Sequence, residues 1–243
     1  MISVIIPTYN DQPYLAETLT ALIPAAVEGL VREVIIADGG STDRTLDIAD
    51  GAGAEIVHGG PSRGARLKAG AERARQPWLL FINADTMMDA GWERETTLHI
   101  ERVQAGRRRA AAASFRFGLD DDGTGPRIVE RLVGVRTAVL KLPHGYQGLL
   151  IPRTLYAEAG GFADLPMLED VDFARRIGRR RLSVINARAV TIGEKFRADG
   201  ALGRMTRNQL RLGLYVLGLP VSAIASLTGG PAEPVGAAVA GRG

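Results

Sequence analysis

The sequence contains no cysteine and little lysine, and its apolar stretches are short or interrupted. Without cysteine, disulfides and thiolate metal sites are excluded, while a reducing cytoplasm is permitted. Lysine occurs only at positions 68, 141 and 195, so the basic charge comes almost entirely from arginine. No basic run is interleaved with aromatic residues, which ranks nucleic-acid binding low. The opening MISVIIP has no basic region ahead of it and too short an apolar run, so we predict no signal peptide.

The composition that remains is that of an ordinary globular protein. Of the 243 residues, 46% are hydrophobic and 23% are charged, which argues against disorder over most of the length. This length fits one large α/β domain, or one domain with an appendage. The net charge of +3 and the pI near 9.5 favour anionic partners, such as phosphorylated ligands or membrane surfaces.

The first half of the chain alternates between strand and helix patterns. Buried strands are predicted at residues 3–7, 33–38, 54–59 and 78–85, and helices at residues 11–23, 41–50 and 63–75. Ser41 or Thr42 is expected to cap the second of these helices. Repeated strand–helix units of this length predict a mostly parallel central sheet with helices on both faces.

Polar residues gather where the predicted strands end. The four strand ends carry PTYND, ADGGSTD, HGGPSRG and NADT, and two of these are rich in glycine. In an open parallel sheet, ligands bind outside the carboxyl ends of the strands. The four strand ends therefore predict one binding site along this edge.

The stretch LLFINADTMMD, residues 79–89, poses a sharper question. If the chain stays extended, Asn83 and Asp85 lie on one side of the strand and Ala84 on the other. This arrangement would place a metal ligand at the edge of the sheet. A strand end closed by a polar turn is an equally good interpretation of these residues alone.

The second half has a different pattern. Residues 110–117 alternate in character, residues 120–125 form a turn or exposed loop, and a helix is predicted at 127–141. Four apolar residues share helical spacing in that helix: Ile128, Leu132, Val135 and Val139. A further strand is predicted at GLLIP, followed by a helix that ends at Gly160 and Gly161. The stretch LEDVDFARRIGRR reads as a helix opened by two acids, which suits its positive N-terminal end.

The tail is apolar but interrupted. No charge occurs from Leu212 until Glu233, yet Gly213, Gly218 and Pro220 break up the apolar residues. A membrane-spanning helix needs about 20 predominantly apolar residues. We therefore predict a helical hairpin packed on the domain, with contact at a membrane surface as the alternative.

Four stretches together resemble family 2 glycosyltransferases: SVIIPTYND, EVIIADGGSTDRT, LLFINADT and GGFADLPMLEDVDFARRI occur in the order found in that family. The resemblance spans roughly residues 1–220. PSRGARLKAGAERA and HGYQGLLIPRTLYAEAGGF also resemble a bacterial subgroup, the transferase 2 proteins associated with radical-SAM and selenium-domain neighbours. The family implies the A-type glycosyltransferase fold, a single Rossmann-like nucleotide-diphospho-sugar transferase domain.

The resemblance also suggests a division of the chain. The glycosyltransferase domain would cover residues 1–200, with a nucleotide-binding half to about residue 105 and an acceptor half from about 106. A C-terminal helical extension would follow at 201–228. Residues 229–243, rich in glycine, alanine and proline, would form a flexible tail.

For the sugar donor, the resemblance implies a nucleotide site built from Pro7, Thr8, Tyr9, Asp38, Arg63, Asn83 and Ala84. Tyr9 offers a ring on which a base could stack, although residues 7–11 could instead form only a strand-to-helix turn. Arg63 lies at a glycine-flanked strand edge suited to a diphosphate. Many family members have a second acid after the residue matching Asp38, whereas this chain has Gly39.

For the metal, Asp85 takes the place of the last acid in the family's Asp-x-Asp motif. That acid binds Mg²⁺ or Mn²⁺, which bridges the phosphates of the donor. Asn83 replaces the first acid and brings no charge, although it can hydrogen-bond a ribose hydroxyl. A hard cation held by one carboxylate, phosphates and waters is normal for magnesium.

For catalysis, the resemblance assigns the family's Glu-Asp motif to Glu169 and Asp170, with Asp170 as the general base. The acceptor hydroxyl must lose a proton as it attacks the anomeric carbon, and a single displacement inverts the configuration. Without the other motifs, two acids at a helix start could equally complement the helix dipole. His144, Tyr146 and Gln147 are expected to line the acceptor or donor-sugar pocket.

The sequence therefore predicts a metal-dependent inverting glycosyltransferase that uses a nucleotide-diphosphate sugar and an unidentified acceptor, with lipid-linked acceptors included. We expect a cytoplasmic location, with peripheral contact at the inner membrane surface through the C-terminal segment as the alternative. Gly39 and Asn83, which stand where the family has acids, favour the competing hypothesis of a non-catalytic nucleotide-binding or nucleotide-sugar-binding module.

Overall fold

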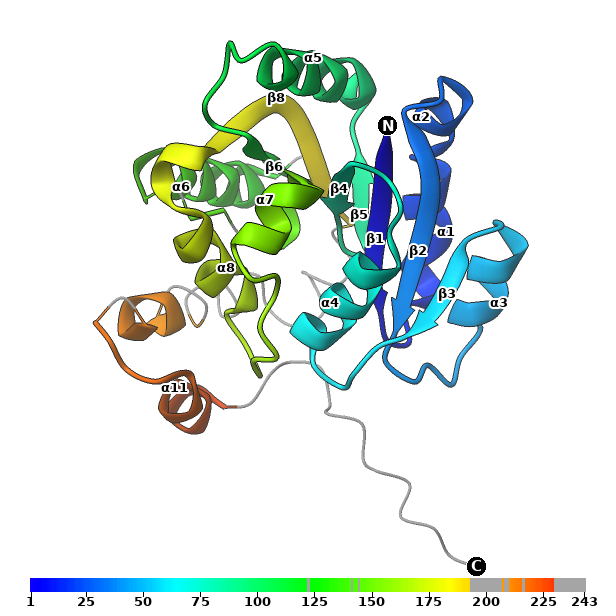
Figure 1. Cartoon of the computed structure of the whole chain (residues 1–243). Helices are drawn as coiled ribbons and strands as arrows, with labels where there is room; N and C mark the ends of the chain where they lie inside the picture. The colour runs from blue at the N-terminus through cyan, green and yellow to red at the C-terminus, as the bar shows by residue number, and fades with distance from the viewer. Residues whose placement is uncertain are drawn as a thin grey trace, which may run out of the picture.

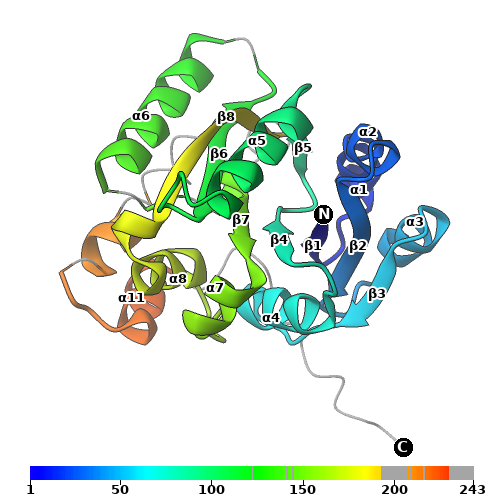
Figure 2. The ribbon, with the colours of Figure 1, turned by 45° about the horizontal axis from the view of Figure 1, so that its top comes forward.

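The structure is a computed structural model that describes residues 1–121, 123–140, 142–143, 145–192, 207, 210–215 and 217–229. The described strands form one eight-stranded sheet in the order β3-β2-β1-β4-β7-β6-β8-β5. Helices lie on both faces of this sheet (Figures 1 and 2). The predicted Rossmann-like α/β fold with a helix-covered central sheet is confirmed.

The first half is a parallel α/β unit. Its strands are β1 (Ile2–Thr8), β2 (Val31–Asp38), β3 (Glu55–His58) and β4 (Trp78–Phe81), and its helices are α1 (Gln12–Thr20), α2 (Ile23–Val27), α3 (Thr45–Gly51) and α4 (Arg63–Arg73). β1 pairs in parallel with β2 and β4, and β2 with β3. The carboxyl ends of β1, β2 and β3 therefore meet at one edge, as predicted.

Two helices of this half differ from the prediction. The pattern at 11–23 belongs to two helices, because Pro24 in the first turn of α2 has no N–H to continue the α1 ladder. α3 begins at Thr45, not at residue 41, so Ser41 and Thr42 are not its caps. The Ser41 hydroxyl instead donates to Asp38, and the Thr42 N–H donates to Asn10.

The second half mixes parallel and antiparallel pairs. Its elements are β5 (Thr86–Met88), α5 (Trp92–Gln104), β6 (Ala112–Leu119), α6 (Thr124–Leu140), the 3₁₀ turn η1 (Gly145–Gln147), β7 (Leu149–Pro152), α7 (Arg153–Glu158), α8 (Glu169–Ile177), the 3₁₀ turn η2 (Arg179–Arg181) and β8 (Leu182–Thr191). β7 runs antiparallel to β4 and β6, β5 runs antiparallel to β8, and β6 pairs in parallel with β8. β7 thus joins the two halves into one sheet.

The core has one layer on each face of the sheet. On β1, Val4 and Ile6 point to one face and pack in a cluster with Leu15 of α1. Ile5 points to the other face and packs in a second cluster with Leu67 of α4. This alternation follows from the two-residue period of a strand. It explains why β1, covered on both faces, reads as an unbroken apolar run.

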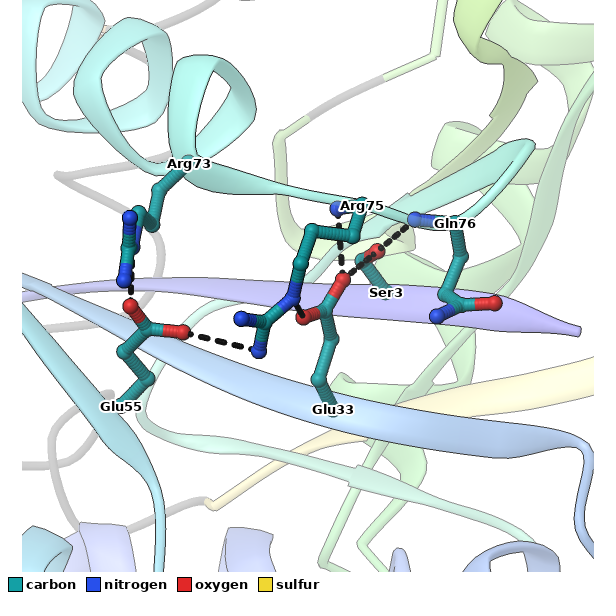
Figure 3. Close-up of polar contacts among 6 residues, drawn as sticks. All are labelled: Ser3, Glu33, Glu55, Arg73, Arg75 and Gln76. Atoms are coloured by element: carbon teal, nitrogen blue, oxygen red, sulfur yellow. Dashed lines mark hydrogen bonds and ion pairs between the residues drawn. The ribbon is translucent and has the colours of Figure 1, made fainter.

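An ion-pair network fastens the amino ends of the strands (Figure 3). Glu33 on β2 accepts from the Ser3 hydroxyl at 2.6 Å and pairs with Arg75 at 2.8 Å. Glu55 at the start of β3 pairs with Arg73 and, at 3.2 Å, with Arg75. The network ties the end of α4 to β1, β2 and β3, at the edge opposite the predicted binding site.

The helix α6 buries a different face from the one that the apolar spacing suggests. The exposed fractions of Ile128, Leu132, Val135 and Val139 are 58%, 56%, 61% and 60%. Val129 and Val133 are buried instead, in a small cluster with Phe117 and Leu119 of β6. The apolar spacing indicated a helix correctly, but the four residues lie on its outer surface.

The C-terminal segment contacts α8. Residues 210–215 are helical, and Leu212 is buried in the same cluster as Phe173 of α8. The Tyr215 hydroxyl donates to Asp172 at 3.3 Å. A further helix, α11 (Val221–Thr228), follows along this side of the molecule (Figure 1).

Residues 193–200 at the end of the predicted transferase domain lie outside the described residues, as do 201–206, 208–209 and 216 of the predicted extension and 230–243 of the predicted tail. Within the part of the chain that the structure describes, no helix is both long enough and apolar enough to cross a membrane.

Candidate active site

The ends of β1 and β2 meet at Asp38, which is buried and accepts four hydrogen bonds. The Thr8 and Ser41 hydroxyls donate to its Oδ1 at 3.0 and 2.5 Å, and the N–H groups of Gly40 and Ser41 donate to its Oδ2 at 2.8 Å each. Burial by itself would raise the pKa of Asp38, but these hydrogen bonds hold it below the usual value. Asp38 therefore shapes the loop after β2.

Asn10 joins the loop after β1 to the loop before α3. Its backbone has a positive φ of 53°, a conformation that asparagine tolerates better than most residues. Its side-chain carbonyl accepts from the Thr42 N–H at 2.8 Å, and its own N–H donates to the Ser41 hydroxyl. The neighbouring Tyr9 is half-buried beside this loop. The sequence PTYND thus forms a strand-to-helix turn that also keeps Tyr9 partly exposed at the strand edge.

Gly39 is explained by a buried arginine. A Cβ added at Gly39 would lie 2.6 Å from the guanidinium of Arg66, so a larger residue would force that side chain to move. Arg66 is buried and donates to the carbonyl of Thr8 at 3.3 Å. Gly39, which stands where many family members have a second acid, therefore leaves room for the buried Arg66 guanidinium at this strand edge.

The sequence NAD is a turn and not an extended strand end. β4 stops at Phe81, and the Thr86 N–H donates to the carbonyl of Asn83 at 3.2 Å. The predicted alternation of Asn83 and Asp85 on one side of a strand is therefore wrong, because the chain curls after Ile82. The Thr18 hydroxyl fixes Ala84 through its carbonyl, and Asp85 itself is buried.

Arg63 brings the two halves together. Its Nε and Nη2 donate to Asn83 Oδ1 at 3.2 and 2.5 Å, and its Nη1 pairs with Glu169 Oε1 at 2.5 Å. Close packing makes this possible: a Cβ on Gly64 would lie 2.1 Å from the carbonyl of Ala163, in the loop before α8. The start of α4, the turn after β4 and the start of α8 therefore converge on one guanidinium.

Glu169 and Asp170 occupy the first turn of α8, as predicted. Glu169 is buried, and burial raises its pKa above the usual value; the positive charge of Arg63 opposes this, and the charge of Asp170 adds to it. Asp170 is half-buried, and its Oδ2 accepts from the Gly145 N–H at 2.6 Å. Arg63 and its partners Asn83 and Glu169 are called the Arg63 junction below. Glu169 thus belongs to this junction, while Asp170 faces the η1 loop.

The η1 loop is held by Gln147. Its amide donates to the carbonyl of Phe115 at 3.0 Å, and its side-chain carbonyl accepts from the Thr137 hydroxyl of α6 at 2.9 Å. Gln147 is buried, so it positions the loop, whereas Tyr146 is half-buried against the small cluster under α6. The third predicted pocket residue, His144, lies outside the described residues.

Arg136 is a candidate that the sequence did not indicate. It lies on α6 with only 8% of its surface exposed, and within the described residues its Nε has no hydrogen-bond partner. Burial lowers its pKa, while the negative charge of Asp170 acts in the opposite direction. No sequence signal separates Arg136 from the exposed Arg131 on the same helix; only the burial of α6 does.

Asp85 offers the donor chemistry that a hard divalent cation needs. Among the described residues, no group of three or more His, Cys, Asp or Glu side chains could enclose a metal by themselves. A carboxylate at a strand edge suits Mg²⁺ or Mn²⁺ when phosphate oxygens and waters complete the shell. The donor set therefore fits an ion that arrives with a diphosphate.

Residues 3–144, more than half of the chain, match the family described as glycosyl transferase family 2. The chain belongs to that family. This agrees with the order of the four motifs and with the convergence of Arg63, Asn83 and Glu169 at one edge of the sheet.

Curated relatives of this family 2 chain match it over part of their length. A PGL/p-HBAD biosynthesis glycosyltransferase of Mycobacterium tuberculosis is 34% identical over 113 residues, which cover 41% of this chain and 40% of the relative. An uncharacterized glycosyltransferase of Mycobacterium bovis is 33% identical over 115 residues, covering 46% and 50%. The chain therefore spans about two fifths to one half of these relatives.

Solved structures share the fold of this family 2 chain. Glucosyl-3-phosphoglycerate synthase from Mycobacterium tuberculosis, in complex with Mn²⁺, uridine diphosphate and phosphoglyceric acid, has a TM-score of 0.60 and 21% identity, covering 90% of this chain and 79% of that one. S. aureus TarS 1-349 in complex with UDP-GlcNAc has a TM-score of 0.56 and 19% identity, covering 78% and 58%. At these identities the likeness establishes the A-type glycosyltransferase fold.

Proposed function

We propose that this chain is a metal-dependent inverting glycosyltransferase that moves a sugar from a nucleotide-diphosphate donor to an acceptor hydroxyl. The observation that carries the proposal is the Arg63 junction, which joins the donor-side Asn83 to Glu169 beside the half-buried Asp170. A nucleotide-binding module would have no need of a second carboxylate next to the junction. A transferase needs one as its base.

On the donor side, the chain would supply the Arg63 guanidinium, a metal ligand and a ring for the base. Arg63 is held in place by Asn83 and Glu169, so its guanidinium is pre-oriented where the leaving diphosphate would gather charge. Asp85 would hold Mg²⁺ or Mn²⁺, which neutralises charge on the departing diphosphate. Tyr9, at the end of β1, would lie against the base.

On the acceptor side, Asp170 would take the proton. The acceptor oxygen forms its bond to the anomeric carbon, the bond from that carbon to the diphosphate oxygen breaks, and the hydroxyl proton passes to the Asp170 carboxylate. A single displacement of this kind inverts the configuration. Backbone N–H groups hold both oxygens of this carboxylate: Gly145 donates to Oδ2 at 2.6 Å and Val171 donates to Oδ1 at 2.8 Å. Either oxygen keeps a lone pair that would receive the proton.

Nucleotide binding tests the donor half of the proposal. UDP is the first nucleotide to try, because UDP or a UDP-sugar is bound in the two structural relatives. We expect calorimetry with UDP, GDP, CDP and dTDP to show Mn²⁺-dependent binding of one of them, lost in Asp85→Ala. Binding that is unchanged by Mn²⁺, or by the substitution, would contradict a metal site at Asp85.

Turnover tests the base. We expect Asp170→Asn to lower transfer or donor hydrolysis by about 10²- to 10⁴-fold, the range for loss of a general base, while nucleotide affinity stays the same. Asp172→Asn is the matched control, because Asp172 lies two residues along the same helix and pairs with Arg176. A wild-type protein that binds a nucleotide sugar without turning it over would favour the module hypothesis.

A further inference from the structure

The outer face of α6 is an apolar surface that the described residues leave uncovered. Its members are Ile128, Leu132, Val135 and Val139, each more than half exposed; they are called the α6 stripe below. Their spacing of three and four residues places them in one line along the helix. Single exposed apolar residues are common, but four aligned on one helix make a contiguous apolar patch, which is typical of an interaction site.

Arginines surround the α6 stripe. Arg127 and Arg131 are exposed on the same helix, and the only acid of α6, Glu130, is paired with Arg127 and Arg188. At the other end, the Arg179 guanidinium donates to the carbonyl of Val139. Arg179 opens the exposed triplet Arg179–Arg181 of η2, called the η2 triplet below. An apolar line with cations at both ends has the chemistry of a membrane-surface helix.

We propose that the α6 stripe and the η2 triplet dock this protein on an anionic phospholipid surface. The stripe would enter the boundary between headgroups and acyl chains, and the arginines would bind lipid phosphates. Each basic residue near an anionic leaflet adds to the attraction, which salt screens. No residue assigned to the donor or base site takes part.

A second copy of the chain fits this surface less well. In an antiparallel pairing of two stripes, Arg127 and Arg131 of each copy would meet the η2 triplet of the other. In a parallel pairing, the two triplets would meet. Either arrangement brings like charges together beside the apolar contact, which opposes association.

Docking through α6 would also place the acceptor side near the lipid. The inner face of α6 carries Thr137, which holds Gln147 of η1, and Gly145 of η1 donates to Asp170. A helix with its side chains is about 10–12 Å across. An acceptor hydroxyl on a lipid headgroup would then lie within reach of Asp170; this link rests on the proposed function, whereas docking itself does not.

Vesicle sedimentation with the full chain tests the proposal. We expect binding to vesicles of phosphatidylglycerol and phosphatidylcholine in equal parts, with weaker binding to phosphatidylcholine alone and weaker binding at high salt. Leu132→Gln with Val135→Gln should weaken binding by about tenfold or more, because two apolar side chains leave the lipid boundary. Ile23→Gln with Val27→Gln is the matched control: both residues are exposed on α2, at the far end of the sheet from α6 (Figure 2).

The chain contains its own control for charge. Residues 107–109 are a second Arg-Arg-Arg sequence, in the loop after α5. We expect Arg180→Gln with Arg181→Gln to reduce binding to anionic vesicles several-fold, and Arg107→Gln with Arg109→Gln to leave it unchanged. Equal effects of the two pairs would mean a diffuse attraction of a basic protein and would overturn the proposal.

Two other results would also overturn it. The first is wild-type protein that stays in the supernatant with both vesicle types. The second is light scattering that shows a dimer which the stripe variant converts to a monomer, since the occupant would then be a second copy. Nucleotide affinity of the stripe variant, measured in solution, separates docking from the proposed function: it should equal that of the wild type whichever way the vesicle assay turns out.

Discussion

Two arginines near Asp170 differ in how fully their N–H groups are hydrogen-bonded. Arg63 pairs with Glu169 and donates twice to Asn83, so folding itself provides its partners. Arg136 is more deeply buried than Arg63, with 8% of its surface exposed against 22% of the Arg63 side chain, yet its Nε has no partner among the described residues. Burying a guanidinium N–H without a hydrogen-bond acceptor costs free energy unless a ligand later supplies one. An anionic group of a substrate would do so.

Arg136→Gln should therefore separate stability from activity. We expect the free energy of unfolding to stay the same or to rise, because a buried charge with an unpaired Nε–H is removed. We expect turnover to fall by about tenfold or more, the size of a lost charged hydrogen bond. Chemical denaturation and a steady-state assay measure the two quantities.

The control for Arg136 lies on the same helix. Arg131 is exposed on α6, and Arg131→Gln should leave turnover in a vesicle-free assay unchanged and should change stability by no more than about 0.5 kcal/mol. A large loss of stability in Arg136→Gln, with turnover per folded molecule unchanged, would show that Arg136 only supports the fold.

At the scale of elements, the parallel half could be predicted and the mixed half only in part. Strands such as β1 are covered on both faces and read as apolar runs, so local pattern located them. The antiparallel insertion of β7 between β4 and β6 depends on pairing with distant residues, which periodicity does not contain. For the same reason the stripe on α6 predicted a helix but not which face is buried.

In the candidate site, too, some residues could be predicted from local pattern and others could not. Arg63, Asn83 and Glu169 could be selected because they stand at strand ends or a helix start, and the structure joins them. The turn at Asn83 could not be predicted, since a strand end and a turn give the same residue pattern. Arg136 stayed hidden because only the burial of α6 distinguishes it from the exposed Arg131.

The amino edge of the sheet should give the protein a specific sensitivity to acid. Burial alone would raise the pKa of Glu33, but hydrogen bonds from Ser3 and Arg75 hold it below its ordinary value of 4.5. The unfolded chain thus takes up a proton on Glu33 at a higher pH than the folded chain does. The stabilisation is present above about pH 4.5 and is lost as the pH falls through the folded pKa.

Glu33→Gln should reveal this window. We expect a loss of about 1–3 kcal/mol in the free energy of unfolding near neutral pH, because the partners of a mostly buried carboxylate are left with a neutral amide. The difference from wild type should shrink as the pH falls from about 5 to about 2. Urea unfolding at several pH values measures it, with Glu17→Gln on the exposed side of α1 as control. A difference that is independent of pH would contradict the assigned cause.

At the scale of the whole molecule, residues 210–215 pack against α8. Leu212 is 5% exposed and lies in the core cluster on the α4 face of the sheet, and Tyr215 donates to Asp172 on the helix that begins with Glu169 and Asp170. Arg175 also lies over the Tyr215 ring, 5.1 Å from its centroid. Removing this segment would expose one side of α8, whatever the segment does at a membrane.

Two truncations should therefore behave differently. Deleting residues 230–243, most of the predicted flexible tail, should leave the free energy of unfolding unchanged, because a stretch rich in glycine, alanine and proline has few side chains to bury in a core. Deleting residues 210–243 should lower it by at least about 2–5 kcal/mol, the usual cost of removing one buried leucine side chain, and should reduce turnover by loosening α8. Leu212→Ala in the full chain should reproduce most of the stability loss, and thermal denaturation of the three variants measures it. If the longer deletion lost only vesicle binding and kept its stability and turnover, the segment would be a membrane anchor and α8 would be held by the domain alone.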